Sequence, residues 1–285
     1  MLQMRVNKPS YCPACGERSL QALLYVKNDC DIRRCNVCGM GQTDTTGFDP
    51  TNYYTDEYFS GGRVDGYADY AATEPVLRRQ FVREVAFLRR HCPTGRVVEI
   101  GCAFGFFLQE ARRYFTVGGI ELSEAAASHC RDAGLHVVTG EASEQTLGLF
   151  APVDVFVLFD VIEHLSDPFD TLRRCMHCLK PGGRIVLTTG DFGSPVARLT
   201  GKHWRLMTPP QHLWFFTGES FRRWGSRVGM RIESYSHPWK IVPLSLIAFQ
   251  FARAVGRSVT LPIGARVGVP VNLFDAMRIV LRKEA

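Results

Sequence analysis

The clearest pattern of hydrophobic and polar positions lies about a third of the way along the chain. Residues 96–100 read RVVEI, and the apolar side chains predict a short buried strand. A turn of small residues follows at 101–105, and apolar residues at helical spacing over 106–115 predict a helix. The apolar run 117–120, which ends at Glu121, predicts a second strand. This order of strand, glycine turn, helix and acid-ended strand is typical of the βαβ unit that holds a nucleoside-containing cofactor.

Apolar runs further along the chain predict that this unit belongs to a larger sheet. Strands are indicated at 136–139, 153–159 and 184–189, and the run 153–159 is apolar enough to be buried on both faces. Ligands of open α/β sheets bind outside the carboxyl ends of the strands. We therefore expect Gly101–Gly105, Glu121, Glu141 and Asp160–His164 to surround one crevice.

Short motifs at fixed spacing make this interpretation more specific. They are Glu99-x-Gly101-x-Ala103-x-Gly105, Gly140-Glu141-Ala142, Asp160-Val-Ile-Glu163-His164-Leu165 and Leu179-Lys-Pro-Gly-Gly183. With them the chain resembles class I S-adenosylmethionine (SAM)-dependent methyltransferases over residues 52–285, and especially the subgroup that acts on quinones, sugars and polysaccharide precursors. Ala103 stands where the family has glycine, a mild departure because the methyl group needs slightly more room.

The resemblance implies a fold of the α/β class. We expect a Rossmann-like seven-stranded sheet in the order 3-2-1-4-5-7-6, with the last strand antiparallel and helices on both faces. Residues 231–235 and 277–282 are candidates for strands six and seven, preceded by a helix over 219–228.

The cofactor that the resemblance implies is SAM. Glu121 lies about 20 residues after the turn, a spacing that lets it bind both ribose hydroxyls, and the resemblance places Glu141 and Ala142 at the adenine. The full set of residues expected to bind SAM is Glu99, Gly101, Cys102, Ala103, Gly105, Glu121, Leu122, Glu141, Ala142 and Asp160.

Ahead of this unit, two C-x-x-C-G motifs predict a metal centre. Cys12 and Cys15 form the first pair, and Cys35 and Cys38 form the second. Four thiolates suit the tetrahedral coordination of structural zinc, and apolar stretches between the pairs could form the hairpin of a zinc ribbon. A segment this short needs its metal to fold. A rubredoxin-type iron site or a redox pair is the alternative.

Methyl transfer to an alcohol requires removal of a proton, and the candidate bases are histidines. His164 follows the predicted fourth strand, with Glu163 beside it, and His212 lies in an insertion after the fifth. The alternative for His164 is that it caps or orients the loop, and the alternative for His212 is a packing role. In some quinone and sugar relatives the matching Glu-His pair helps to bind a divalent cation, so Glu163 and His164 are candidate ligands of Mg²⁺.

We expect three parts in the chain: a zinc ribbon over 1–50, a lid and connecting helices over 51–92, and the methyltransferase domain over 93–285 with insertions at 190–216 and 237–274. Tyrosines at the start of the second part suit either a lid over the cofactor or plain packing. The second insertion opens with an apolar, helix-like stretch over 239–253. It is a candidate wall of the acceptor pocket, oligomer interface or membrane-facing surface.

Composition places the protein among globular proteins, with 46% hydrophobic and 22% charged residues. The N-terminus lacks the apolar core of a signal peptide, and ten cysteines then favour a reducing compartment. We expect a cytoplasmic protein, with peripheral contact at the inner face of the membrane through 239–257 as an alternative. The net charge of +6 comes from the last third of the chain, which suits phosphate on a nucleotide sugar or lipid head group.

The function predicted from the sequence is SAM-dependent methyl transfer, to oxygen in preference to carbon. The expected acceptor is small or lipid-linked, namely a sugar hydroxyl in a nucleotide-sugar or glycan precursor, as in polysaccharide biosynthesis. One alternative is an RNA methyltransferase with a zinc-ribbon recognition module, but the ribbon is nearly neutral, so nucleic acid is a poor candidate partner. The other alternative is a non-catalytic SAM-binding protein whose ribbon docks a partner.

Overall fold

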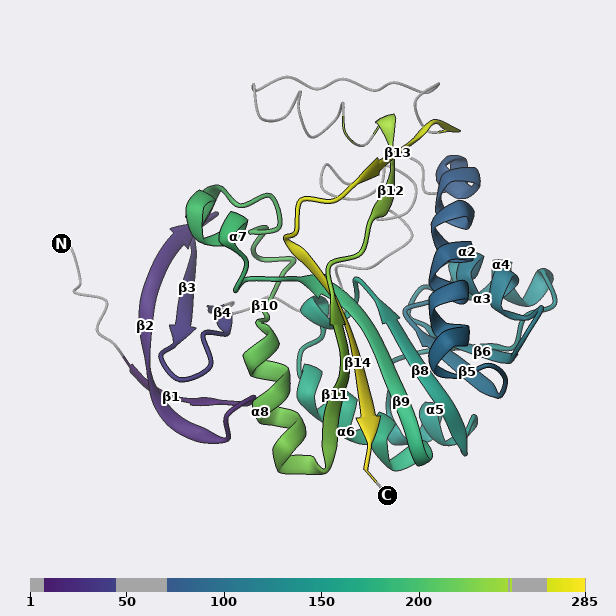
Figure 1. The fold of residues 1–285 in the computed structure, drawn as a ribbon, viewed down its shortest axis with the longest axis horizontal. Coiled ribbons are helices and arrows are strands. Elements are labelled where there is room, and N and C mark those ends of the chain that lie inside the picture. The colour runs from purple at the N-terminus through teal and green to yellow at the C-terminus, as the bar shows by residue number, and fades with distance from the viewer. Residues whose placement is uncertain (1–7, 45–70, 246, 248–265, 285) are drawn as a thin grey trace. The chain divides into compact units, whose positions relative to one another are not determined.

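The computed structural model describes residues 8–44, 71–245, 247 and 266–284 (Figure 1). The chain divides into two compact units. Residues 1–50, 156–238 and 273–285 form one, and residues 51–155 and 239–272 form the other. The tyrosine-rich segment predicted to form a lid and most of the stretch 239–257 lie outside the described residues.

The N-terminal cysteine motifs belong to an antiparallel sheet in the first unit. It contains β1 (Lys8–Cys12), β2 (Glu17–Lys27), β3 (Cys30–Cys35) and β4 (Gly41–Asp44), and β4 also pairs with β10 (Trp214–Phe215). Each C-x-x-C-G motif makes a tight turn between two strands, and Gly16 and Gly39 adopt the left-handed conformation there, with φ of 72° and 73°. The predicted hairpin therefore exists as β2 and β3.

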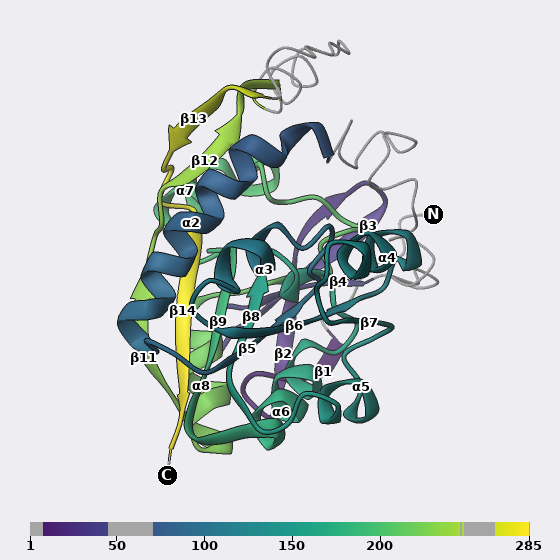
Figure 2. The same ribbon diagram turned by 90° about the vertical axis from the view of Figure 1, so that its right-hand side faces the viewer.

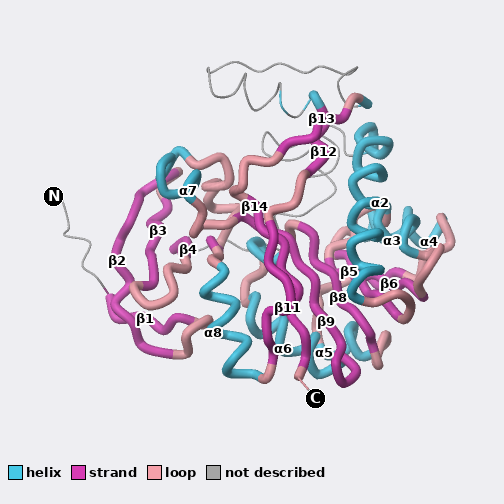
Figure 3. The backbone as a smooth tube through the Cα atoms, in the orientation of Figure 1, coloured by secondary structure: helices cyan, strands magenta, loops and turns pink. Residues whose placement is uncertain are grey.

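The main sheet has seven strands, which Figure 3 distinguishes from the helices. Their order across the sheet is β11-β14-β9-β8-β5-β6-β7. Numbered along the chain, this is the predicted order 3-2-1-4-5-7-6, and β14 runs antiparallel to both of its neighbours as predicted. The strand bounds are β5 (Arg96–Ile100), β6 (Thr116–Glu121), β7 (Val137–Thr139), β8 (Val153–Phe159), β9 (Leu179–Gly190), β11 (Met230–Ser236) and β14 (Ala276–Lys283).

The α-helices are α2 (Glu74–His91), α3 (Phe106–Ala111), α4 (Glu124–Asp132), α5 (Glu144–Gly148), α6 (Pro168–Cys178), α7 (Pro195–Thr200) and α8 (Gly218–Val228). Most begin at a side chain that accepts a hydrogen bond from a backbone amide of the first turn. These N-caps are Ser123, Ser143, Asp167, Ser194 and Thr217. In the part of the chain that the structure describes, three 3₁₀ turns accompany these helices, η2 (Ala71–Thr73), η3 (Ile162–His164) and η4 (Gly201–His203). Among the helices of the described residues, none has the length and hydropathy needed to cross a bilayer.

The structure corrects two predicted boundaries and the type of one predicted element. The helix expected over 106–115 ends at Ala111, and the strand expected from Arg184 begins at Leu179. The start of the helix expected over 239–253 is instead strand β12 (Lys240–Pro243), which pairs with β13 (Gly268–Val271). Two β-branched residues favour a strand there, Pro243 disfavours a helix interior, and the partner strand lies too far along the chain to be foreseen. Figure 2 shows α2 beside β12, where Gln80 Oε1 accepts from the Ile241 amide at 2.8 Å.

Candidate active site and metal centre

The glycine turn after β5 lies in the second unit. The amide of Gly101 donates to the carbonyl of Ile120 at 2.8 Å, which holds the turn against the end of β6. Gly105 begins α3 with φ of +71°, and a Cβ there would lie 2.6 Å from Leu135 Cδ1 and 2.9 Å from Cys130 Sγ. The turn thus requires glycine at 105, both for its backbone conformation and for space.

Ala103 has φ of +45°, a left-handed conformation that L-residues other than glycine seldom adopt. The departure from the family motif at this position therefore concerns backbone conformation as well as room for a methyl group. A non-glycine residue held in this region costs about 1–2 kcal/mol. The turn bears this cost next to the expected cofactor, where backbone strain often accompanies function.

Glu121 ends β6, and its carboxylate fixes the glycine turn. Its Oε2 accepts from the amide of Ala103 at 2.8 Å, and its Oε1 accepts from the amide of Ser123 at 3.0 Å. Burial raises the pKa of Glu121, while the hydrogen bonds from these backbone amides lower it. Because each carboxylate oxygen can accept more than one hydrogen bond, the group can also bind hydroxyls of a ligand.

Glu99 lies within β5 and is buried. Burial raises its pKa well above the usual range, and the neighbouring Cys130 and Glu121 add to the rise. A cationic ligand beside Glu99 would favour the charged form. The side chain of Cys102 packs inward, since a Cβ on Gly119 would lie 2.8 Å from its Sγ. Only the backbone of Cys102 is thus well placed to serve a ligand.

The remaining predicted SAM residues follow the ends of other strands. Leu122 comes directly after Glu121 and is exposed, and Glu141 and Ala142 follow β7, whose end is tied to β6 by a 2.8 Å bond from the Gly140 amide to the Glu121 carbonyl. In the second unit, the structure thus places Leu122 after β6, and Glu141 and Ala142 after the neighbouring parallel strand β7. Asp160 belongs to the first unit and directly follows β8 with φ of +56°. Thr188 Oγ1 donates to its Oδ1 at 2.9 Å.

The first unit brings Glu163, His164 and His212 together. Their potential ligand atoms lie within 4.8 Å of one another, and the two imidazole rings meet edge to face with centroids 4.7 Å apart. His164 Nδ1 lies 3.0 Å from the carbonyl of Gln211, and His212 Nδ1 lies 2.7 Å from the carbonyl of Leu206. A carbonyl only accepts, so each Nδ1 donates, and each neutral ring carries its lone pair on Nε2.

Both histidines are neutral at physiological pH. Burial lowers the pKa of His164 to about 4, and it lowers that of His212 to about 3 with a further contribution from the charge of His164. Two neutral imidazoles with Nε2 lone pairs beside a buried carboxylate can accept a proton from a bound hydroxyl. The same set offers two nitrogens and one carboxylate to a cation, which suits a transition metal better than Mg²⁺, an ion that prefers oxygen ligands. The donor set therefore fits magnesium poorly.

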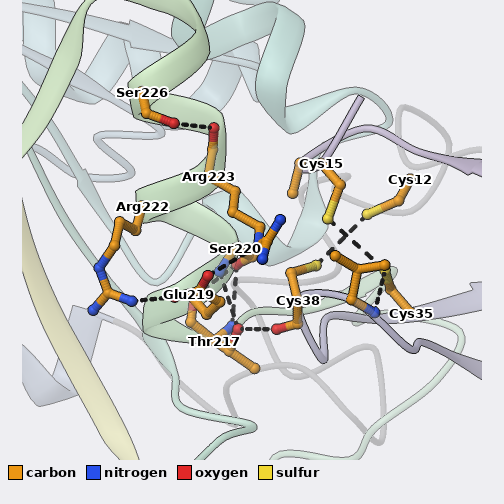
Figure 4. A network of polar contacts seen from close by, with 12 residues as sticks. Cys12, Cys15, Cys35, Cys38, Thr217, Glu219, Ser220, Arg222, Arg223 and Ser226 are labelled. Atoms are coloured by element: carbon orange, nitrogen blue, oxygen red, sulfur yellow. Dashed lines mark hydrogen bonds and ion pairs between the residues drawn. The ribbon is translucent and has the colours of Figure 1, made fainter. Parts of the chain in front are cut away.

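The four cysteines of the N-terminal motifs form a second cluster (Figure 4). Cys12 and Cys38 have their sulfurs 3.7 Å apart, and Cys15 and Cys35 have theirs 3.9 Å apart. Four sulfurs bound to one zinc ion at about 2.3 Å in a tetrahedron would lie about 3.8 Å from one another. The donor set and its spacing both fit zinc.

Sequence reasoning missed a polar cluster at the ends of β9 and β11. The buried Asp191 follows β9, and its Oδ2 accepts from the Tyr235 hydroxyl at 2.6 Å and contacts His237 Nε2 at 3.0 Å. Burial raises the pKa of Tyr235, and the hydrogen bond to Asp191 adds to the rise. Part of the signal was present in the sequence, since Asp191 and His237 each lie two residues after a predicted strand.

The family comparison agrees with this geometry. The sequence profile of the methyltransferase domain family matches residues 72–235, more than half of the chain. The chain therefore belongs to the methyltransferase family. This confirms the predicted enzyme class, a SAM-dependent methyltransferase, and the predicted α/β fold.

Curated relatives resemble a shorter part of the chain. A ubiquinone biosynthesis O-methyltransferase of Caulobacter sp. (strain K31) is 38% identical over 101 residues, which cover 33% of this chain and 40% of the relative. The ubiquinone biosynthesis O-methyltransferase of Methylococcus capsulatus is 31% identical over 120 residues, which cover 40% of this chain and 49% of the relative. The matched regions span less than half of the length of these relatives.

Solved structures share the fold at low sequence identity. A complex of the Haloferax volcanii Trm112 methyltransferase activator with its putative methyltransferase gives a TM-score of 0.55 at 16% identity and covers 81% of this chain and 99% of that one. Magnesium protoporphyrin IX methyltransferase from Synechocystis, with bound S-adenosylhomocysteine, gives a TM-score of 0.52 at 13% identity. The match covers 83% of this chain and 100% of that one. These likenesses concern the fold alone.

Proposed function

We propose that this methyltransferase transfers a methyl group from SAM to a hydroxyl oxygen of a small or lipid-linked acceptor. The observation that carries the proposal is the pair of His164 and His212, two neutral imidazoles with Nε2 as the acceptor nitrogen. An alcohol must lose its proton as its oxygen takes the methyl group, and the Nε2 lone pair of a neutral imidazole can receive it. Burial makes both imidazoles weaker bases than a solvent-exposed histidine, with pKa values of about 4 and about 3. The relatives named O-methyltransferases support oxygen as the acceptor atom.

SAM supplies the methyl group on a sulfonium, and residues within and after the carboxyl ends of β5, β6 and β7 bind it in this proposal. Glu121 accepts hydrogen bonds from the ribose hydroxyls, and Glu99 places negative charge near the cationic groups. Glu141 and Ala142 contact the adenine, and Gly101–Gly105 brings backbone close to the ligand. As the bond from sulfur to the methyl carbon breaks and the bond from oxygen forms, the hydroxyl proton passes to a histidine Nε2. The other product is S-adenosylhomocysteine.

For the acceptor we propose a sugar hydroxyl of a nucleotide-sugar or glycan precursor. The basic surplus of the last third of the chain supports an acceptor that carries phosphate. The second candidate is a ring hydroxyl of a quinone precursor, which the names of the curated relatives favour. Both share the chemistry of an alcohol or phenol beside a general base.

The four-cysteine cluster holds zinc in this proposal. All four sulfurs are buried and spaced as a tetrahedral site requires, so no ligand position is left for a reacting water. The metal therefore stabilises the ribbon and takes no part in the chemical step.

The experiment that tests the proposal supplies methyl-labelled SAM with three acceptor pools: nucleotide sugars, polyprenylated phenols and mixed RNA. Label that enters the sugar pool as a base-stable methyl ether supports the first acceptor, and label in the phenol pool supports the second. Label in RNA alone, or on carbon, overturns the proposal. His177→Ala, at an exposed histidine of α6, is the control for variants of the histidine pair.

A further inference from the structure

The last strand of the cysteine ribbon lies directly against the segment that carries His212. Trp214 and Phe215 of β10 pair with Gln42 and Gly41 of β4. The ribbon sheet therefore continues into the insertion that follows β9. His212 is two residues from the start of this paired segment, so its backbone lies next to the ribbon.

Thr43 makes the contact to His212 itself. Its hydroxyl donates to the backbone carbonyl of His212 at 2.7 Å, and its amide donates to the carbonyl of Leu213 at 2.8 Å. On its other side the amide of Leu213 donates to the carbonyl of Glu163 at 2.9 Å. The segment 212–213 is thus held between the ribbon and the element that carries Glu163 and His164.

The same segment also orients His164. The Nδ1 of His164 donates to the carbonyl of Gln211, the residue before His212. Any shift of this backbone therefore alters the orientation of both rings. Thr43 is 4% exposed, so water has little access to replace the bond from its hydroxyl.

Two further contacts join the ribbon to the insertion. Asn28, in the turn between β2 and β3, donates from Nδ2 to the carbonyl of Pro209 at 2.7 Å. Ile32 of β3 is fully buried in a core cluster with Trp204 and Phe215. The insertion thus has part of its hydrophobic core supplied by the ribbon.

The ribbon is in turn anchored by helix α8 at both cysteine turns. Thr217, the N-cap of α8, donates from Oγ1 to the carbonyl of Cys38 at 2.8 Å, as Figure 4 shows. Near the end of α8, Arg227 donates to the carbonyls of Pro13 and Ala14 at 3.2 and 3.1 Å. These bonds hold the cysteine turns in place, and β4 begins three residues after Cys38.

We propose that the cysteine ribbon positions the His164–His212 pair, with Thr43 as the positioning residue. The inference rests on the proposed function in which this pair serves the methyl acceptor. A zinc ion bound by the four cysteines fixes the turn that leads into β4, and β4 fixes the backbone of His212. The ribbon is thereby a part of the catalytic framework, and metal loss from it impairs the histidine pair.

The test compares Thr43→Val with Thr200→Val in the full-length, zinc-loaded protein. Both substitutions remove a hydroxyl that donates to a backbone carbonyl at 2.7 Å, but the Thr200 hydroxyl donates to Val196 within α7 and not to the segment that carries His212. We expect Thr43→Val to lower kcat by roughly ten- to a hundredfold, since small displacements at a reacting centre have effects of that size. The dissociation constant for SAM should be unchanged, and Thr200→Val should retain wild-type kcat.

A readout independent of activity is the imidazole nitrogen and proton spectrum of His164 and His212. Thr43→Val should shift these signals and Thr200→Val should not, and Thr43→Ser, which keeps the hydroxyl, should restore them. Removal of zinc with a thiol reagent and a chelator should produce the same shifts. Unchanged signals in Thr43→Val and in the zinc-free protein would overturn the inference.

Failure of the proposed function is a separate result. If the wild type transfers no methyl group to any acceptor pool, the proposed chemistry fails, while the histidine spectra still decide whether the ribbon positions the pair. Should Thr43→Val not fold, Asn28→Ala removes the second contact from the ribbon to the insertion and should shift the same signals by a smaller amount. No shift in Asn28→Ala would then count against the inference.

Discussion

The imidazole rings of His164 and His212 lie with their centroids 4.7 Å apart, although the two residues come from different elements of the first unit. His164 ends η3 after β8, and His212 lies in the insertion just before β10. Their proximity depends on two hydrogen bonds, one from the amide of Leu213 to the carbonyl of Glu163 and one from the His164 ring to the carbonyl of Gln211. The pair is therefore a product of tertiary structure, and each ring depends on the segment of the other.

Replacement of either histidine should lower the rate of methyl transfer. In His164→Ala and His212→Ala, we expect kcat to fall by roughly 10²- to 10⁴-fold, the range for loss of a general base. His177→Ala should leave the rate unchanged, because this histidine is exposed on α6. Steady-state kinetics with labelled SAM measures the effect, and wild-type rates in both single variants would exclude the pair as the base.

The histidine pair should also make stability depend on pH. Its folded-state pKa values, about 4 and about 3, lie below the value near 6.5 of an unfolded histidine. At pH values between the folded and unfolded pKa values, the unfolded chain therefore binds more protons than the folded protein. The stabilisation is present in full above about pH 6.5 and is lost as the pH falls toward 3.

Urea unfolding across this pH window measures that dependence. We expect the free energy of unfolding of the wild type to fall more steeply between about pH 6.5 and 4 than that of the double variant His164→Gln/His212→Gln, which lacks the titrating rings. Identical slopes for the two proteins would mean that the pair does not titrate with lowered pKa values.

Substitutions at two glycines should separate backbone strain from steric clash. Gly105 and Gly134 have φ of +71° and +73°. Among the described residues a Cβ on Gly134 meets nothing within 4 Å, whereas one on Gly105 meets Leu135 and Cys130. Gly134→Ala should cost about 1–2 kcal/mol of stability from backbone conformation alone. Gly105→Ala should cost more and should abolish the rise in melting temperature with SAM. Equal losses in the two variants would contradict the role of the turn.

Loss of the ribbon metal should destabilise the protein. Cys38→Ser should lower the zinc content and the melting temperature, because the ribbon is too short to fold on apolar burial alone. Cys30→Ser is the matched control, since this cysteine belongs to the same sheet but lies outside the metal cluster. Metal analysis and calorimetry give the answer, and full zinc occupancy in Cys38→Ser would rule out four-cysteine coordination.

Local sequence was sufficient to predict the glycine turn and the seven strands of the main sheet, but not the start of β9 or the strand β12. Strands such as β8 are continuous apolar runs, and the turn at 101–105 is bounded by a strand and a helix with clear periodicity. The left-handed conformation of Ala103 could not be predicted. The hydrogen bond that helps to fix it, from the Ala103 amide to the Glu121 carboxylate, joins residues 18 positions apart.

The candidate site was predicted in its residue types but not in its framework. His164 and His212 were proposed separately, and the contact between them arises from backbone bonds across the first unit. The cluster of Asp191, Tyr235 and His237 was missed because it requires the ends of β9 and β11 to meet. The bond from Thr43 to His212 joins residues 169 positions apart, a distance at which no local pattern operates.

Titration calorimetry of the purified protein with SAM tests the central claim most directly. We predict saturable binding of one SAM per chain, retained in His212→Ala and lost in Gly105→Ala, with a matching rise in melting temperature for the proteins that bind. Absence of binding heat and of any thermal shift with either SAM or S-adenosylhomocysteine would contradict the account.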